Sequence, residues 1–116
     1  MDPYKYPPGD YEKLKDVVVE LTGSPFGEDV ALTLPSPCIS LADRNIDVQL
    51  PFADGLRAGT FRVIRQFHSK AKPYQVEMHA AGSTTEPINV VIKDGDDLRQ
   101  DQIVLVILEF LSLIHI

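Results

Sequence analysis

Hydrophobic residues recur at helical spacing near the start of the chain, with polar residues between them. This spacing predicts an amphipathic helix over 11–21 whose apolar face is formed by Tyr11, Leu14, Val17, Val18 and Leu21. Asp10 is placed to cap the start of this helix, and Gly23 is placed to end it, with Pro25 two residues later. Residues 1–9 contain three prolines, so we expect a mobile lead-in there.

Farther along, apolar and polar residues alternate with the period of two that a β-strand requires. The segments with this pattern are 46–50, 61–67, 74–79 and 88–93. The polar stretch 68–73 joins two of them and predicts a hairpin loop. Residues 23–37 are expected to form a linker, and 38–50 one or two short strands.

The apolar run near the end of the chain, 103–108, can be interpreted in two ways. Its β-branched residues favour a buried strand. Asp96 or Asp97 could instead cap a helix after the turn Asp94-Gly95, and the length of the run suits a helix. We expect the helix, which gives an α+β fold: an antiparallel sheet with a packed helix, preceded by one helix.

Composition narrows the function classes. The chain has 116 residues, enough for one small domain, and its net charge of −6 gives no support for nucleic-acid binding. Cys38 is the sole cysteine, so an internal disulfide is impossible, which fits a reducing cytosol. No uninterrupted apolar stretch reaches the ~20 residues that a membrane span requires.

The most informative segment is Lys93-Asp94-Gly95-Asp96-Asp97-Leu98-Arg99-Gln100-Asp101. By spacing alone it describes a solvated lysine at a strand end, followed by a polar turn. The residues themselves resemble the signature that opens the catalytic domain of phosphatidylinositol 3- and 4-kinases and their protein-kinase relatives. Gly95 to Asp101 follow the lipid 3-kinase pattern, and the resemblance covers mainly Leu34 to Glu109.

The hairpin loop extends the resemblance. Without the downstream signature it would be a plain hairpin, but Phe67, Ser69 and Pro73 match the pattern of the family's phosphate-binding loop. Gln75 departs from the family, since many relatives place a large apolar or aromatic residue near that position, above the adenine. The ATP-binding residues that the resemblance implies are Lys93, Ser69, Asp101, Val91, Phe67, Lys70 and Pro73.

Each of these residues has an implied role. Lys93 would contact the α- and β-phosphate oxygens of ATP, and Ser69 would contact the outer phosphates. Val91 would line the adenine pocket, and Asp101 would stand at its back. Lys70, with Lys72, would add positive charge near the phosphates.

The resemblance implies a partial kinase N-lobe over 34–110, after a lead-in helix and linker over 1–33. The catalytic loop and the Asp-Phe-Gly that binds Mg²⁺ do not occur in the chain, so we expect an inactive fragment without catalytic residues. Residues 111–116 look like a translated sequencing adapter and are expected to be a non-native tail.

Gln102 directly after Asp101, and Phe67 two residues before Ser69, are most similar to class III phosphatidylinositol 3-kinase. That enzyme phosphorylates the 3-position of phosphatidylinositol on endosomal and autophagic membranes, with ATP and Mg²⁺. The resemblance thus implies a cytoplasmic protein, peripheral on internal membranes, with regulatory subunits. The alternatives are a class I 3-kinase, a 4-kinase, or a non-catalytic α/β interaction domain or degenerate kinase relative.

Overall fold

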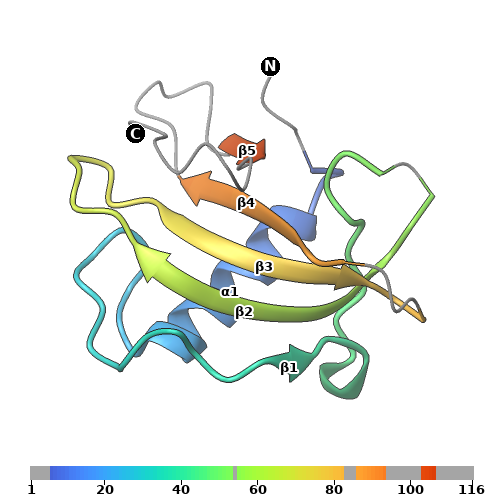
Figure 1. Cartoon of the computed structure of the whole chain (residues 1–116), viewed down its shortest axis with the longest axis horizontal. Helices are drawn as coiled ribbons and strands as arrows, with labels where there is room; N and C mark the ends of the chain where they lie inside the picture. Colours follow the sequence, from blue (N-terminus) through green and yellow to red (C-terminus); the bar gives the residue numbers. More distant parts are fainter. Residues whose placement is uncertain (1–5, 54, 83–85, 94–102, 107–116) are drawn as a thin grey trace.

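The computed structural model describes residues 6–53, 55–82, 86–93 and 103–106. Its elements are α1 (Asp10–Thr22), β1 (Ile39–Ser40), the 3₁₀ turn η1 (Ala42–Arg44), β2 (Ala58–Gln66), β3 (Tyr74–Ala80), β4 (Ile88–Lys93) and β5 (Ile103–Val106). The five strands form one sheet in the order β1-β2-β3-β4-β5, and every neighbouring pair is antiparallel. The sheet is therefore a simple meander, and α1 crosses one of its faces (Figure 1).

The first helix is confirmed, and its ends show how the chain enters and leaves it. Gly23 adopts a left-handed conformation (φ 72°) and donates its N–H to the carbonyl of Val19 at 2.9 Å, as expected of a helix-ending glycine. The predicted cap at the other end is wrong: the residue before the helix is Gly9, and no side chain caps it. Asp10 lies inside the helix, where its carboxylate accepts the backbone N–H of Gln49 at 3.0 Å.

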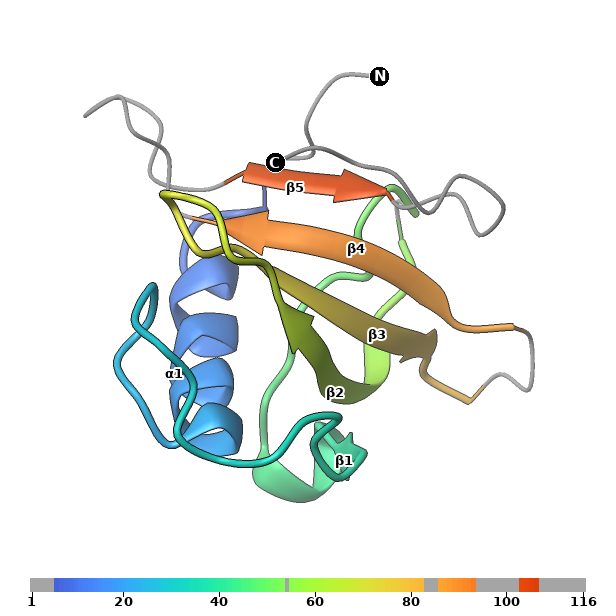
Figure 2. The same cartoon turned by 60° about the vertical axis from the view of Figure 1, so that its left-hand side comes forward.

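The hydrophobic core lies between α1 and the sheet (Figure 2). Leu14 and Val18 of α1 and Phe61, Val76 and Val90 of the strands are completely buried there. Residues on both sides of position 33 thus contribute to one core. The division into a lead-in and an N-lobe remains a prediction.

The segments on either side of α1 are more ordered than the sequence suggested. Tyr6 is only 4% exposed and its ring lies 6.2 Å from that of Tyr11, so the lead-in is packed at this residue; residues 1–5 lie outside the described part. In the expected linker, the ring of Phe26 lies 6.2 Å from that of Tyr11 and 4.8 Å from that of Tyr74. Phe26 therefore joins the helix to the sheet, because it contacts aromatic rings on both.

Three of the predicted strands are confirmed as β2, β3 and β4. The segment 46–50 is not a regular strand and contributes only the isolated bridge between Gln49 and Arg57. The short strand expected over 38–50 is β1, whose two residues pair with Phe61 and Thr60.

The helix expected after the turn is wrong over Ile103–Val106, which is β5. This strand pairs with the free edge of β4, with Val90 opposite Val106 and Lys93 opposite Ile103. The β-branched residues suit an extended chain, and the edge of β4 supplies backbone partners for it. Residues 94–102, which include the predicted cap, and the tail 107–116 lie outside the described residues.

Candidate functional site

The loop between β2 and β3 is closed by its own backbone. The N–H of Phe67 donates to the carbonyl of Pro73 at 2.9 Å, and the N–H of Lys72 donates to the carbonyl of Ser69 at 3.0 Å. Lys72 takes a positive φ of 46° to make this inner turn. The predicted phosphate-binding loop is thus a short, hydrogen-bonded hairpin connection.

Strand register places Lys93 at the same end of the sheet as this loop. Tyr74 pairs with Ile92, so Lys93 follows one position later, level with Pro73. Val91 pairs with Gln75, and alternation puts Val91 and Lys93 on the same face. This face, opposite α1, is called the open face below. Figure 1 shows β4 ending beside the β2–β3 loop.

Within the loop, Ser69, Lys70 and Lys72 have different environments. The hydroxyl oxygen of Ser69 is buried and has no hydrogen-bond partner among the described residues. Lys70 is exposed. Lys72 forms an ion pair with Asp29 at 3.0 Å, so its charge is partly engaged by the segment after α1.

Phe67 and Pro73 form the base of the loop. Pro73 is buried, and the guanidinium of Arg65 lies 4.5 Å from the centre of the Phe67 ring. A cation stacked on an aromatic face at this distance is attracted to the ring. Phe67 is therefore held against β2 by its neighbour two residues earlier.

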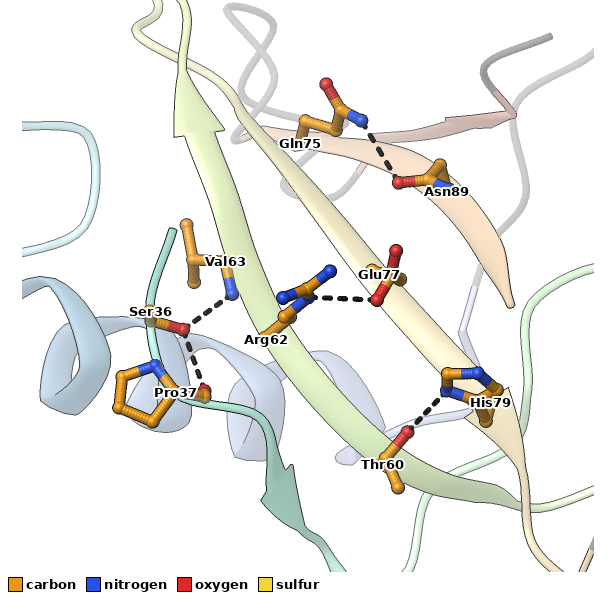
Figure 3. Close-up of polar contacts among 9 residues, drawn as sticks. All are labelled: Ser36, Pro37, Thr60, Arg62, Val63, Gln75, Glu77, His79 and Asn89. Atoms are coloured by element: carbon orange, nitrogen blue, oxygen red, sulfur yellow. Dashed lines mark hydrogen bonds and ion pairs between the residues drawn. The ribbon is translucent and has the colours of Figure 1, made fainter. Parts of the chain in front are cut away.

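Gln75 belongs to a polar ladder that crosses three strands on the open face. Nε of Arg65 donates to Oε1 of Gln75 at 3.0 Å, and Nε2 of Gln75 donates to Oδ1 of Asn89 at 3.0 Å. Figure 3 shows the bond between Gln75 and Asn89, with the parallel contacts of Arg62 with Glu77 and Thr60 with His79. A glutamine in place of a large apolar residue thus uses both its amide oxygen and its amide nitrogen in hydrogen bonds across the sheet.

Val91 is the apolar residue of this region. It is only 1% exposed, yet it lies on the open face and outside the core cluster beneath α1. Lys93 is partly exposed, and none of the described residues forms an ion pair with it. Asp101, the remaining predicted site residue, lies outside the described residues, so its position relative to Lys93 stays a prediction.

One residue that sequence reasoning missed, Gln66, ties the loop to the segment after α1. Its Nε2 donates to the carbonyls of Glu28 at 2.9 Å and Lys72 at 3.2 Å, and its Oε1 accepts the N–H of Val30 at 3.2 Å. Tyr74 adds another link to that segment, because its hydroxyl accepts the N–H of Gly27 at 2.8 Å. A polar residue at the end of a strand carries no sequence signal for contacts with residues about forty positions away.

Three hollows of the described surface lie away from Ser69 and Lys93. One of about 540 Å³ lies at the opposite end of the sheet, around Thr60 and His79, and an adjoining one of about 390 Å³ lies around Arg57. A third, of about 570 Å³, lies between β2 and the segment after α1. The described residues contain no group of three or more His, Cys, Asp or Glu side chains arranged to hold a metal ion.

Together, the described elements define a small α+β domain: an antiparallel meander with one helix against it and a polar loop at the end of the strand that carries Lys93. No protein-family model matches the chain, and no solved structure matches it. No helix in the described part has the length and apolar character needed to span a membrane.

Proposed function

We propose that the chain is part of the ATP-binding N-lobe of a lipid kinase, with phosphatidylinositol 3-kinase of class III as the most similar type. The full enzyme would transfer the γ-phosphate of ATP to the 3-hydroxyl of phosphatidylinositol. It would act from the cytoplasm on endosomal or other internal membranes, together with regulatory subunits. The proposal begins from the signature Lys93 to Asp101.

One structural observation carries the proposal. The register of β3 and β4 places Lys93 level with Pro73. Lys93 and the β2–β3 loop that carries Ser69 therefore lie at the same end of the sheet. Phosphoryl transfer depends mostly on positioning and on neutralising phosphate charge, which requires a cation beside backbone and hydroxyl donors. Lys93 and the loop would supply these groups together.

Three further observations support it. The hydroxyl of Ser69 is buried and has no hydrogen-bond partner among the described residues. It could therefore donate a hydrogen bond to a phosphate oxygen. Val91 is an apolar residue two positions before Lys93 on the same face, where the adenine would lie, and it is 1% exposed in this structure. Lys70 remains exposed and could add charge near the phosphates.

The chain would hold half of a nucleotide site. The catalytic base and the Mg²⁺ ligands would belong to a downstream lobe, so this chain alone would bind ATP weakly and transfer no phosphate. The strand β5 differs from the helix that the resemblance predicts at the same position. A lipid kinase containing this segment must therefore place its acidic helix, if it has one, before Ile103 or after Val106.

The proposal is tested first on the chain itself. In an ATP titration followed by NMR, we expect shifts of the backbone amides of Phe67 to Lys72 and of Lys93, and these should be lost in Lys93→Ala. Lys13→Ala is the matched control, because Lys13 lies on α1, on the other side of the sheet, and donates to the carbonyl of Asp47. Equal loss in both variants, or shifts confined to α1, would overturn the proposal.

The second test uses the chain extended by its downstream coding sequence. We expect a catalytic Asp and Asn followed by Asp-Phe-Gly, and phosphorylation of phosphatidylinositol vesicles that falls at least about a hundredfold in Lys93→Ala. A downstream sequence lacking these residues would favour the second candidate, a non-catalytic α/β interaction domain or degenerate kinase relative. The polar open face, whose side chains bond to one another across the strands, is the observation that favours this candidate.

A further inference from the structure

The hollow of about 570 Å³ lies between the segment after α1 and the end of β2. Its walls include Asp29, Leu32 and Leu34 on one side, and Ile64, Arg65 and Lys72 on the other. Its volume falls within the range of about 300–1,000 Å³ that is typical of small-molecule sites. Neither Ser69 nor Lys93 lines it, and Lys72 is the one lining residue that the proposed nucleotide site also uses.

Part of this hollow is apolar and open to water. Leu32 is 54% exposed, and Leu34 and Ile64 are partly exposed around the same space. Burial of exposed aliphatic side chains by a ligand is favourable, because it removes their apolar surface from water. They would therefore hold the apolar part of a ligand.

The remainder of the hollow carries an excess of positive charge. Arg65 and Lys72 outnumber the one acid, Asp29, although the whole chain has a net charge of −6. Nε of Arg65 donates to Gln75 and the guanidinium lies against the Phe67 ring, but its terminal nitrogens form no hydrogen bond with a described residue. A guanidinium with free terminal N–H groups can bind a carboxylate or phosphate through two hydrogen bonds.

Lys72 can join such a contact without a large penalty. Its ion pair with Asp29 is 3.0 Å long, and the side chain of Asp29 is 80% exposed. Exposed pairs of this kind are weak, because water and salt screen them. An anion in the hollow could therefore replace Asp29 as the partner of Lys72.

We propose that this hollow binds a small amphipathic anion. The carboxylate or phosphate group would lie between Arg65 and Lys72, and the apolar part would lie on Leu32, Leu34 and Ile64. This site does not depend on the proposed kinase function, because neither Ser69 nor Lys93 lines it, although Lys72 is the residue that the resemblance also places near the ATP phosphates.

The test is an NMR titration of the whole chain with octyl phosphate below its micelle concentration. We expect amide shifts at Val30, Leu32 and Ile64, with saturable binding. Inorganic phosphate has only the anionic group of the probe, and 1-octanol has its apolar chain without the phosphate. Each should bind at least about tenfold more weakly than octyl phosphate. Equal binding of inorganic phosphate at these residues would overturn the amphipathic assignment.

Three variants separate the site from general effects. Lys72→Gln and Leu32→Ser should each weaken octyl phosphate binding about five- to tenfold. Lys13→Gln, on α1 and outside the lining, should change the affinity less than about twofold. Because Leu32 and Lys72 are not buried, all three variants should retain the amide dispersion of the parent chain, which the same spectra report.

Two results would overturn the proposal. The first is an affinity that neither Lys72→Gln nor Leu32→Ser changes, or shifts that lie on the open face around Lys93. The second is sedimentation with phosphatidic acid vesicles in the absence of any response to soluble octyl phosphate, which would indicate a membrane-docking surface. Binding of both the vesicles and the soluble probe at this site would support a shared phosphate-monoester chemistry.

Discussion

The buried side chain of Ser36 acts as a strand partner for Val63. The N–H of Ser36 donates to the carbonyl of Val63 at 2.8 Å, and the Ser36 hydroxyl accepts the N–H of Val63 at 2.9 Å (Figure 3). The same hydroxyl donates to the carbonyl of Pro37 at 3.0 Å. Beyond the two-residue strand β1, this serine satisfies the backbone of β2 where a longer edge strand would otherwise do so.

Ser36→Ala should therefore destabilise the fold. The variant leaves the buried N–H of Val63 without its acceptor, which costs about 1–3 kcal/mol. We expect urea unfolding followed by circular dichroism to show a lower midpoint with an unchanged slope. Thr33→Ala is the control, since Thr33 is exposed; a Ser36→Ala midpoint equal to that of this control would contradict the account.

Two neighbouring valines of α1 should respond differently to truncation. Val18 is completely buried against the sheet, whereas Val19 is 38% exposed. Val18→Ala removes two buried methyl groups and should lower the free energy of unfolding by about 2 kcal/mol. Val19→Ala should be neutral or slightly stabilising, because alanine is the better helix former. Equal losses in the two variants would show that α1 does not pack with the orientation described.

The ion pair between Arg62 and Glu77 on the open face should contribute more to stability than the exposed pair between Asp47 and Arg57. Arg62 and Glu77 are 2.9 Å apart, and the Glu77 side chain is only 16% exposed. Glu77→Ala should cost about 1 kcal/mol of stability, because the partner hydrogen bond is lost in a partly desolvated setting. Asp47→Ala removes the pair with Arg57, in which the Asp47 side chain is 78% exposed, and should leave the unfolding midpoint almost unchanged. Thermal unfolding of both variants in low and high salt measures the difference.

Ser69→Ala tests whether the Ser69 hydroxyl contributes to ATP binding or to the stability of the fold. Because this buried oxygen has no partner among the described residues, its removal should leave the melting temperature unchanged or raise it slightly. The same variant should reduce the ATP-induced shifts at the loop if the hydroxyl contacts a phosphate. Calorimetry and the NMR titration check the two halves; a fall in melting temperature with unchanged ATP shifts would assign Ser69 a purely structural role.

Much of the fold follows from local patterns. Helical spacing over Tyr11 to Leu21 and alternation in the three central strands require no knowledge of distant residues, and both predictions are confirmed. A glycine with positive φ likewise marks the end of α1. For the candidate site, alternation also predicts that Val91 and Lys93 share a face, as the register of β3 and β4 shows.

What the sequence by itself determined was therefore the period and the ends of most elements, since these depend on neighbours within one or two turns. Only the tertiary structure decided whether Ile103–Val106 is helix or strand, because the deciding partner is the free edge of β4. It also decided that the Asp10 carboxylate accepts the N–H of Gln49 rather than capping α1. In the same way it decided that Gln66 forms hydrogen bonds with the segment after α1. Such hydrogen bonds join residues far apart in the chain. They can stabilise the fold only after the core has brought their donor and acceptor together.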